Sequence, residues 1–299
     1  MQTTKGIMAV FAHADDVELG CGGTLSKYRK LFGYRIDYIM STNNMSGAWC
    51  TLNADGKLES RKCPWHEMMP QRKKEADAAA KEFYGTEAVH LDHPQRHYLD
   101  DSLNKIDLRY GNPQPAGTLP DQPSILTAAE SPDAVARLTG LILERNPEVI
   151  FTHAGVDPNP EHTCTAWLVI RAYRKAREQG YAGSLLLSAG RHSAEAAASY
   201  SRPDTFIDIS GEWMEQKIGA LAVHLCQSAG IFAEKICRSG VPPPEHGPGI
   251  EAAEKFIVHQ LAEDNAGELT QELKKNLFVR YLNTDRKTGK IVYLSECRS

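Results

Sequence analysis

Cysteine pairs at short spacing are missing from this sequence, which contains no Cys-x-x-Cys. A disulfide scaffold, or a zinc knuckle built on thiolates, would show close and even-numbered spacing. The chain instead has an odd and widely scattered set of seven cysteines: Cys21, Cys50, Cys63, Cys164, Cys226, Cys237 and Cys297. We therefore expect reduced thiols, most of them buried.

A basic excess is also missing, since 34 Lys and Arg residues face 38 Asp and Glu residues and the net charge is −4. Nucleic-acid-binding proteins usually carry the opposite balance. No apolar run approaches the ~20 residues that cross a bilayer, and the first residues lack the regions of a signal peptide. We expect a cytoplasmic protein with no nucleic-acid or membrane partner. Whether it forms a homo-oligomer is left open.

Internal repeats and clean linkers are absent as well, so we expect one domain over residues 1–299. The composition, 41% hydrophobic and 24% charged, is that of an ordinary soluble protein. Strand patterns are predicted at 7–12, 35–41, 88–91, 148–153, 185–187 and 206–209. Helical patterns alternate with them at 18–31, 71–83, 131–146 and 210–228, and a further one follows residue 163 and runs to about 179. This alternation predicts an α/β fold with a doubly wound, mainly parallel sheet and helices on both faces.

Two segments show neither the helical nor the strand period of apolar residues, and we predict inserted loops there, at about 43–70 and 109–131. The first contains Trp49 and Trp65, which either contact a substrate covered by the loop or anchor the loop to the body. Towards the C-terminus, helices are expected at 250–262 and 267–276. The segments 278–282 and 291–294 are expected to form a β-hairpin.

The first candidate site is His13-Ala-Asp15-Asp16, directly after the strand at 7–12. Ligands and catalytic groups collect where strands of an open α/β sheet end. Two adjacent aspartates repel, which raises the pKa of one of them. A bound cation would offset this charge repulsion and leave the second carboxylate free to act as a base. The alternative is a surface turn.

A second candidate segment, Asp157-Pro-Asn159-Pro-Glu161-His162, follows the strand at 148–153 and opens a helix. Both segments lie just past buried strands, so they can converge on one ion although they are far apart in the sequence. The run Gly20-Cys-Gly22-Gly23 raises the alternative of a dinucleotide site. It fails the Gly-x-Gly-x-x-Gly spacing, and the acidic groups before it would repel a pyrophosphate.

These two motifs resemble those of the LmbE/PIG-L family, zinc-dependent deacetylases of N-acetylglucosamine-containing compounds and related amides. The family's first motif is usually written His-Pro-Asp-Asp-Glu, and this chain has Ala14 in place of the proline and Val17 in place of the glutamate. The second is usually Asp-x-His-Pro-Asp-His, and Asn159 and Glu161 replace its inner histidine and aspartate.

The resemblance implies a Rossmann-like fold and an N-deacetylase acting on an N-acetylated sugar, glycoconjugate or small amide. Position by position, it implies that His13, Asp16 and His162 bind Zn²⁺ and that Asp15 is the general base. Two histidines and one carboxylate, with a fourth position open for water, are what a catalytic zinc needs. The sequence does not distinguish zinc from another divalent metal such as Fe²⁺.

Asn159 is the departure that bears most on catalysis, because the family's histidine at this position is assigned to oxyanion stabilisation. An asparagine can donate a hydrogen bond, but it cannot carry a positive charge or pass a proton. His153 or His224 could take over that task. Losing one oxyanion donor typically costs ~10²–10³-fold in rate. A catalytically weak, sugar-binding or structural relative of the family is therefore the second hypothesis.

Weaker similarity supports the assignment at two places, Arg72-Lys-Lys-Glu75 and the segment from 208 to 227 that contains His224. Arg72 is a candidate substrate contact, with an ion pair to Glu75 or to a neighbouring residue as the alternative. His224 is predicted either to line the substrate pocket or to lie at a subunit contact. Glu161 is expected to orient a ligand histidine, and Asp157 either does the same or shapes the turn.

Overall fold

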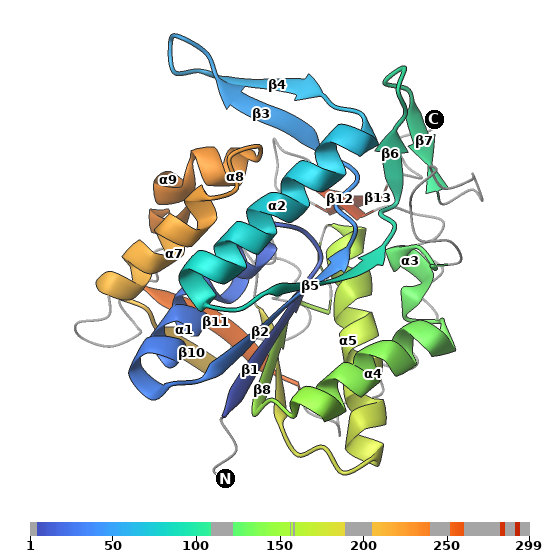
Figure 1. Cartoon of the computed structure of the whole chain (residues 1–299), viewed down its shortest axis with the longest axis vertical. Coiled ribbons are helices and arrows are strands. Elements are labelled where there is room, and N and C mark those ends of the chain that lie inside the picture. Colours follow the sequence, from blue (N-terminus) through green and yellow to red (C-terminus); the bar gives the residue numbers. More distant parts are fainter. Residues whose placement is uncertain are drawn as a thin grey trace.

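A seven-stranded sheet forms the centre of the fold (Figure 1). The computed structural model describes residues 5–108, 122–155, 157, 159–188, 205–239, 252–259, 282–284 and 291–293. The strand order in the central sheet is β10-β11-β9-β8-β1-β2-β5. These strands are β1 (Gly6–Phe11), β2 (Arg35–Thr42), β5 (Ala88–His93), β8 (Val149–Thr152), β9 (Ser184–Ser188), β10 (Thr205–Asp208) and β11 (Ala253–Val258).

Most of the sheet is parallel, as the alternation of strands and helices predicts. Strand β1 pairs in parallel with β2 and β8, and the outer pairs β2–β5 and β8–β9 are parallel too. Only β11 runs the other way, antiparallel to both β9 and β10. The α/β class and the mainly parallel sheet are confirmed.

Helices cover both faces of the sheet (Figure 1). One face carries α1 (Asp16–Phe32), α2 (Trp65–Tyr84) and α7 (Glu212–Ala222), and the other carries α3 (Ile125–Ala128), α4 (Pro132–Arg145) and α5 (Pro160–Glu178). Successive strand side chains point to opposite faces. Accordingly, Met8 and Val10 of β1 lie in the core under α4 and α5, whereas Ile7 and Phe11 lie in the core under α1 and α2.

The glycines after the first motif allow α1 to pack closely. A Cβ added at Gly20 would lie 2.6 Å from the ring of Phe11, and one at Gly23 would lie 2.9 Å from Ile209. Gly33 ends the helix with φ of 69°, the left-handed conformation that favours glycine. This glycine run thus serves helix packing rather than phosphate binding.

The prediction of a loop over 43–70 is wrong. Strands β3 (Ala48–Leu52) and β4 (Leu58–Lys62) pair as an antiparallel hairpin, and α2 begins at Trp65 with Pro70 inside it. Every residue of β4 is exposed, so no apolar alternation marks this strand in the sequence. In the second predicted loop, α3 lies within 122–131, and 109–121 is outside the described residues.

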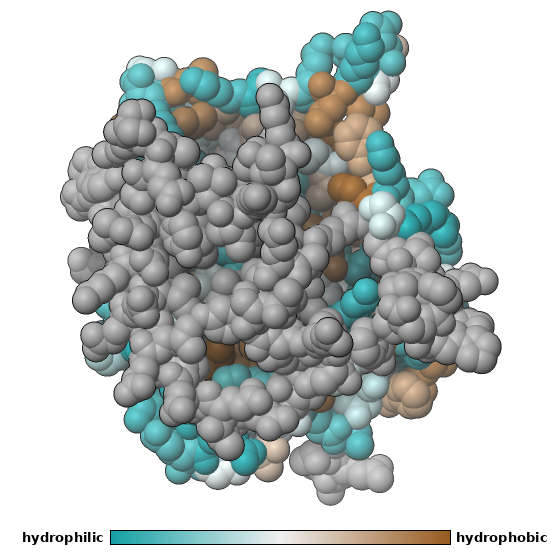
Figure 2. All heavy atoms as spheres, turned by 180° about the vertical axis from the view of Figure 1, so that it is seen from behind, coloured by the Kyte–Doolittle hydropathy of each residue, from teal (hydrophilic) through white to brown (hydrophobic). Residues whose placement is uncertain are grey.

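Two hairpins stand near the carboxyl ends of the parallel strands (Figure 1). They are β3–β4 and the pair β6 (His97–Leu99) and β7 (Lys105–Asp107). From behind, the projecting end of the β3–β4 hairpin is hydrophilic, with hydrophobic residues nearer the body (Figure 2). Leu52 and Leu58, which face each other across this hairpin, are 49% and 41% exposed.

Two helices predicted towards the C-terminus differ from the structure. The predicted helix at 250–262 is wrong, because residues 253–258 form β11 between β9 and β10. Ser210 does not cap a helix running to 228: α7 begins after Gly211 and ends at Ala222, and two short helices follow, α8 (Ser228–Ile231) and α9 (Ala233–Arg238).

Composition explains the error at β11. Ala, Glu and Lys favour a helix, but Glu254 and Phe256 are buried at the two-residue period of a strand. The predicted helix at 267–276 lies outside the described residues. The predicted C-terminal hairpin is found as β12 (Leu282–Thr284) antiparallel to β13 (Ile291–Tyr293). Within the described part of the chain, no helix is long and apolar enough to cross a membrane.

Candidate metal centre

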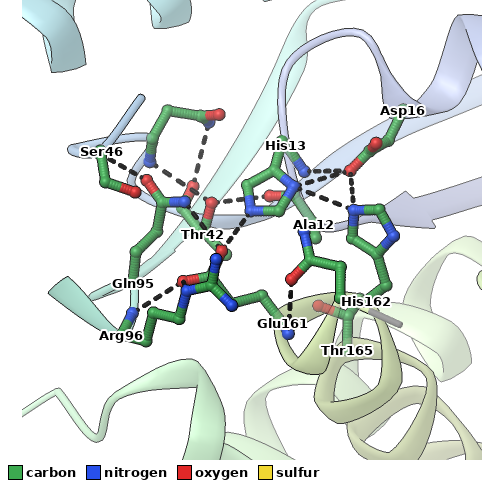
Figure 3. Close-up of polar contacts among 12 residues, drawn as sticks. Ala12, His13, Asp16, Thr42, Ser46, Gln95, Arg96, Glu161, His162 and Thr165 are labelled. Carbon is green, nitrogen blue, oxygen red and sulfur yellow. Dashed lines mark hydrogen bonds and ion pairs between the residues drawn. The ribbon is translucent and has the colours of Figure 1, made fainter. Parts of the chain in front are cut away.

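Three side chains from two distant segments converge at the carboxyl end of β1 (Figure 3). His13 comes from the turn after β1, Asp16 is the first residue of α1, and His162 comes from the first turn of α5. Asp16 Oδ2 lies 3.0 Å from His13 Nδ1 and 3.3 Å from His162 Nε2, and these two nitrogens are 3.2 Å apart. One atom from each residue thus points at a common centre.

This geometry fits a bound cation. Zinc ligands at about 2.0–2.1 Å in a tetrahedral arrangement lie about 3.3 Å from one another. The three donor atoms form a triangle of this size, equivalent to one face of such a tetrahedron. Two imidazole nitrogens that face each other also repel through their lone pairs unless a proton or a cation lies between them. The donor set therefore suits a divalent metal with at least one position open.

Each of the two histidines is held from behind by a second carboxylate. Glu161 Oε2 accepts a 2.6 Å hydrogen bond from His13 Nε2, and Asp157 Oδ1 lies 3.2 Å from His162 Nδ1. A carboxylate on the rear nitrogen fixes the ring orientation and leaves the front nitrogen as a metal donor. Glu161 and Asp157 are both buried.

The charges around Asp16 favour its ionised form. Burial alone would raise the pKa of Asp16, but the neighbouring His162 and His13 hold it well below its usual range. Burial likewise opposes protonation of His162, yet Asp16 and Asp157 raise the pKa of His162 well above its usual value. The protein groups thus place negative charge where the three donor atoms meet, so that a cation, or protons held in its place, is required there.

Asp15 differs from Asp16 in both conformation and charge state. Its φ of 98° is rare for a residue with a side chain, and such backbone strain costs ~1–3 kcal/mol. Burial and the charge of Asp16 raise the pKa of Asp15 to about 6, while Arg72, whose Nη2 is 3.7 Å from Asp15 Oδ1, acts in the opposite direction. A carboxylate with a pKa near neutrality can both accept and return a proton at physiological pH.

Asn159 is the N-cap of α5. Its Oδ1 accepts a 3.0 Å hydrogen bond from the backbone N–H of Glu161. Because a backbone N–H can only donate, the oxygen of the carboxamide is committed to the helix and the Nδ2 group points away from it. The two N–H donors of Asn159 Nδ2 take no part in this cap.

His153, at the end of β8, is unsuited to replace the family's oxyanion histidine as a cation. Its ring stacks on His162 with centroids 4.0 Å apart. Its Nε2 accepts the backbone N–H of Ala12 at 2.9 Å, so that nitrogen carries no proton. Burial and the neighbouring His162 lower the pKa of His153 to about 4.

Two predicted substrate contacts, Arg72 and His224, are bonded to groups of the protein itself. Arg72 is 4% exposed, and its guanidinium donates to the backbone oxygens of Ser46 and Ala14 at 3.0 Å each. His224 is fully buried, and its Nε2 lies 3.1 Å from Glu18. Arg72 forms its ion pair with the neighbouring Asp15 rather than with Glu75, and His224 is directed at Glu18 inside the protein.

The two tryptophans of the first insert are also placed by the hairpin and α2. Trp49 lies in β3, where the guanidinium of Arg61 sits 4.8 Å from its ring centre, and it packs against the small core of Cys63, Met68 and Cys226. Trp65 is the first residue of α2, and its ring contacts His66 edge-on. Trp49 therefore anchors the hairpin to the body, which is one of the two roles that the sequence leaves open.

Gln95 and Arg96 also hold Glu161 (Figure 3), a role that the sequence does not indicate although it places the segment 90–97 at a strand end near the site. Gln95 Nε2 donates to Glu161 Oε2 at 3.0 Å, and the backbone N–H of Arg96 donates to Oε1 at 2.8 Å. Both residues follow β5, and the rule that strand ends collect functional groups could have found them. The sequence analysis missed Glu18, fully buried against Tyr38 and His224, one residue after the position where the family motif has its glutamate.

Comparison with known proteins agrees with this geometry. Residues 8–173 match the family described as PIG-L, GlcNAc-PI de-N-acetylase. The 1D-myo-inositol 2-acetamido-2-deoxy-alpha-D-glucopyranoside deacetylase of Mycobacteroides abscessus is 27% identical over 252 residues, which cover 75% of this chain and 82% of that protein.

Solved structures show the same fold. GalB, the 4-carboxy-2-hydroxymuconate hydratase from Pseudomonas putida KT2440, superposes with a TM-score of 0.59 at 20% identity, over 86% of this chain and 97% of that one. The N,N'-diacetylchitobiose deacetylase from Pyrococcus horikoshii superposes with a TM-score of 0.54 at 19% identity, over 85% and 84% of the two chains. At these identities the likeness concerns the fold alone.

Proposed function

This chain belongs to the GlcNAc-PI de-N-acetylase family, and on that premise we propose that it hydrolyses the acetamide of an N-acetylated sugar or glycoconjugate at a zinc ion held by His13, Asp16 and His162. The observation that carries the proposal is that the donor atoms of these three side chains lie within 4.8 Å of one another, while the adjacent Asp15 is not one of the three. The curated relative from Mycobacteroides abscessus, a deacetylase of an acetamido sugar, supports the same substrate class.

The residues divide the work as their contacts suggest. A zinc ion at this site would supply an activated water and polarise the amide carbonyl. Asp15 takes a proton from the attacking water and passes it to the leaving amine. Asn159 would donate a hydrogen bond from its Nδ2 to the developing oxyanion. Glu161 and Asp157 keep the two histidine rings in the orientation that exposes one nitrogen of each.

The second hypothesis, a catalytically weak sugar-binding relative, rests on Asn159. An amide donor retains the hydrogen bond but not the charge of a protonated histidine, so the step would be slowed rather than abolished. A hydratase shares this fold, as the structure from Pseudomonas putida shows. The product formed, rather than the fold, decides between these reactions.

The test is acetate release from N-acetylglucosamine, N,N'-diacetylchitobiose and N-acetylglucosaminyl-inositol. We expect the wild type to release acetate and to retain about one divalent ion per chain. The Asp15→Asn variant should keep its metal and lose nearly all turnover, because the amide cannot accept the proton. Metal far below one ion per chain under retaining conditions, or activity that survives this substitution, would refute the proposal. The cytoplasmic location stays a prediction.

A further inference from the structure

The turn that carries Asp15 is held by a complete set of hydrogen bonds. Every backbone N–H and C=O of residues 12–14 has a partner. The N–H groups of Ala12, His13 and Ala14 donate to His153 Nε2, Asp16 Oδ2 and Asn44 Oδ1, and the oxygens accept from Thr42, Asp16 and Arg72. A turn fixed by this many partners can hold its next residue in a strained conformation.

Asn44 is the partner that no sequence motif indicates. It follows β2, is fully buried and has φ of 59°, a left-handed conformation that asparagine adopts more readily than most residues. Its Nδ2 donates to the backbone oxygen of Thr42 at 3.3 Å, and its Oδ1 accepts the N–H of Ala14 at 2.9 Å. Contacts other than the one with Ala14 therefore fix both the backbone and the carboxamide of Asn44.

The two peptide planes that flank Ala14 are thus anchored by two different side chains. Asn44 holds the plane that contains the Ala14 N–H, and Arg72 holds the plane that contains the Ala14 C=O at 3.0 Å. The second plane also contains the nitrogen of Asp15. Together with the next peptide, whose oxygen accepts the N–H of Leu19, it defines the φ of 98° at Asp15. In this turn the anchored planes, rather than the preference of Asp15, decide where its carboxylate lies.

We propose that Asn44 is a positioning residue for Asp15, acting through the Ala14 peptide. The family motif usually has proline at position 14, which has no N–H and restricts φ by its ring. Ala14 has a free φ and a buried N–H that requires an acceptor, and Asn44 supplies both the acceptor and the restraint. The inference rests on the proposed function, in which Asp15 is the general base.

The first test is Asn44→Gly, which tolerates the left-handed backbone but removes the side chain. With N,N'-diacetylchitobiose as substrate, we expect kcat to fall about 10- to 100-fold, the loss typical of a misplaced catalytic group. KM and the metal content should stay within about twofold, a split that general destabilisation does not produce. The matched control is Asn146→Gly, a left-handed asparagine at φ 43° on the surface after α4, which should leave kcat unchanged.

The second test does not depend on activity. Exchange of the Ala14 amide hydrogen, followed by NMR with ¹⁵N-alanine labelling, should be much faster in Asn44→Gly than in the wild type and unchanged in Asn146→Gly. Ala14→Pro removes the same hydrogen bond from the other side, so adding Asn44→Gly to Ala14→Pro should change kcat by less than about threefold.

Three results would overturn the proposal: unchanged exchange at Ala14, kcat within twofold of the wild type in Asn44→Gly, or full additivity of the two substitutions. A wild type that releases no acetate from any of the three substrates defeats the proposed function instead. In that case the exchange rate alone decides whether Asn44 anchors the turn.

Discussion

Asp15→Asn should stabilise the folded protein near neutral pH while abolishing turnover. The pKa of Asp15 is raised to about 6 from 3.8 by burial and by Asp16, and its side chain is only 14% exposed. A carboxyl group with a raised folded-state pKa contributes stability below pH ~4, and this contribution is lost as the pH rises through ~6. At ~1.4 kcal/mol per pH unit, the ionised group costs the folded state on the order of 3 kcal/mol at pH 7.5.

An asparagine has the same shape without the charge and is tolerated at positive φ. The variant should therefore be more stable than the wild type by ~2–3 kcal/mol at pH 7.5, and the difference should fall to about 1 kcal/mol at pH 4.5. Urea unfolding of both proteins in the presence of a chelator, at these two pH values, measures the effect. Chelation matters because a cation beside Asp15 would lower its pKa and mask the difference.

The control is Asp55→Asn, which alters an exposed carboxylate in the turn of the β3–β4 hairpin. Its carboxylate lies in water, so this change should leave stability nearly the same at both pH values. A variant at position 15 that is no more stable than the wild type at pH 7.5, or whose advantage does not depend on pH, would refute the argument that Asp15 is held as an unfavourable buried base.

Two further substitutions test the groups around the metal centre. Glu161→Gln should lower zinc affinity ~10- to 100-fold in chelator competition, because three donors, His13 among them, then face a group with only one oxygen. Glu178→Gln, at the exposed end of α5, is the control, and equal affinities would show that Glu161 does not orient the histidine. Asn159→His should retain activity with a new pH dependence of kcat/KM, and an unchanged profile would mean that position 159 does not face the oxyanion.

Much of the fold could be predicted because local signals agreed with the tertiary structure. Buried runs at β1 and β8 contain mainly apolar residues, as parallel strands do. Ser131 caps α4 and Gly33 ends α1 as expected from their chemistry. Where local and tertiary preferences disagreed the prediction failed, as at β11, where pairing on both edges overrides helical composition.

The candidate site divides in the same way. Histidines and aspartates just after strands indicate a metal, since few other arrangements explain adjacent carboxylates. The targets of Arg72 and His224 could not be predicted, because a long or buried side chain reaches partners that are remote in sequence. Ser46 and Ala14 for Arg72, and Glu18 for His224, become neighbours only when α2 and α7 pack on the sheet.

The sequence by itself predicted a candidate metal centre after two strands, because residue type and strand position are both local properties. It also predicted different roles for Asp15 and Asp16, since repulsion between two adjacent ionised carboxylates raises the pKa of one of them. Only the tertiary structure decided which carboxylates hold the histidines, and that Asn44 and Arg72 fix the turn before Asp15. Those contacts join groups far apart in the chain, and their distances are set by how helices and strands pack.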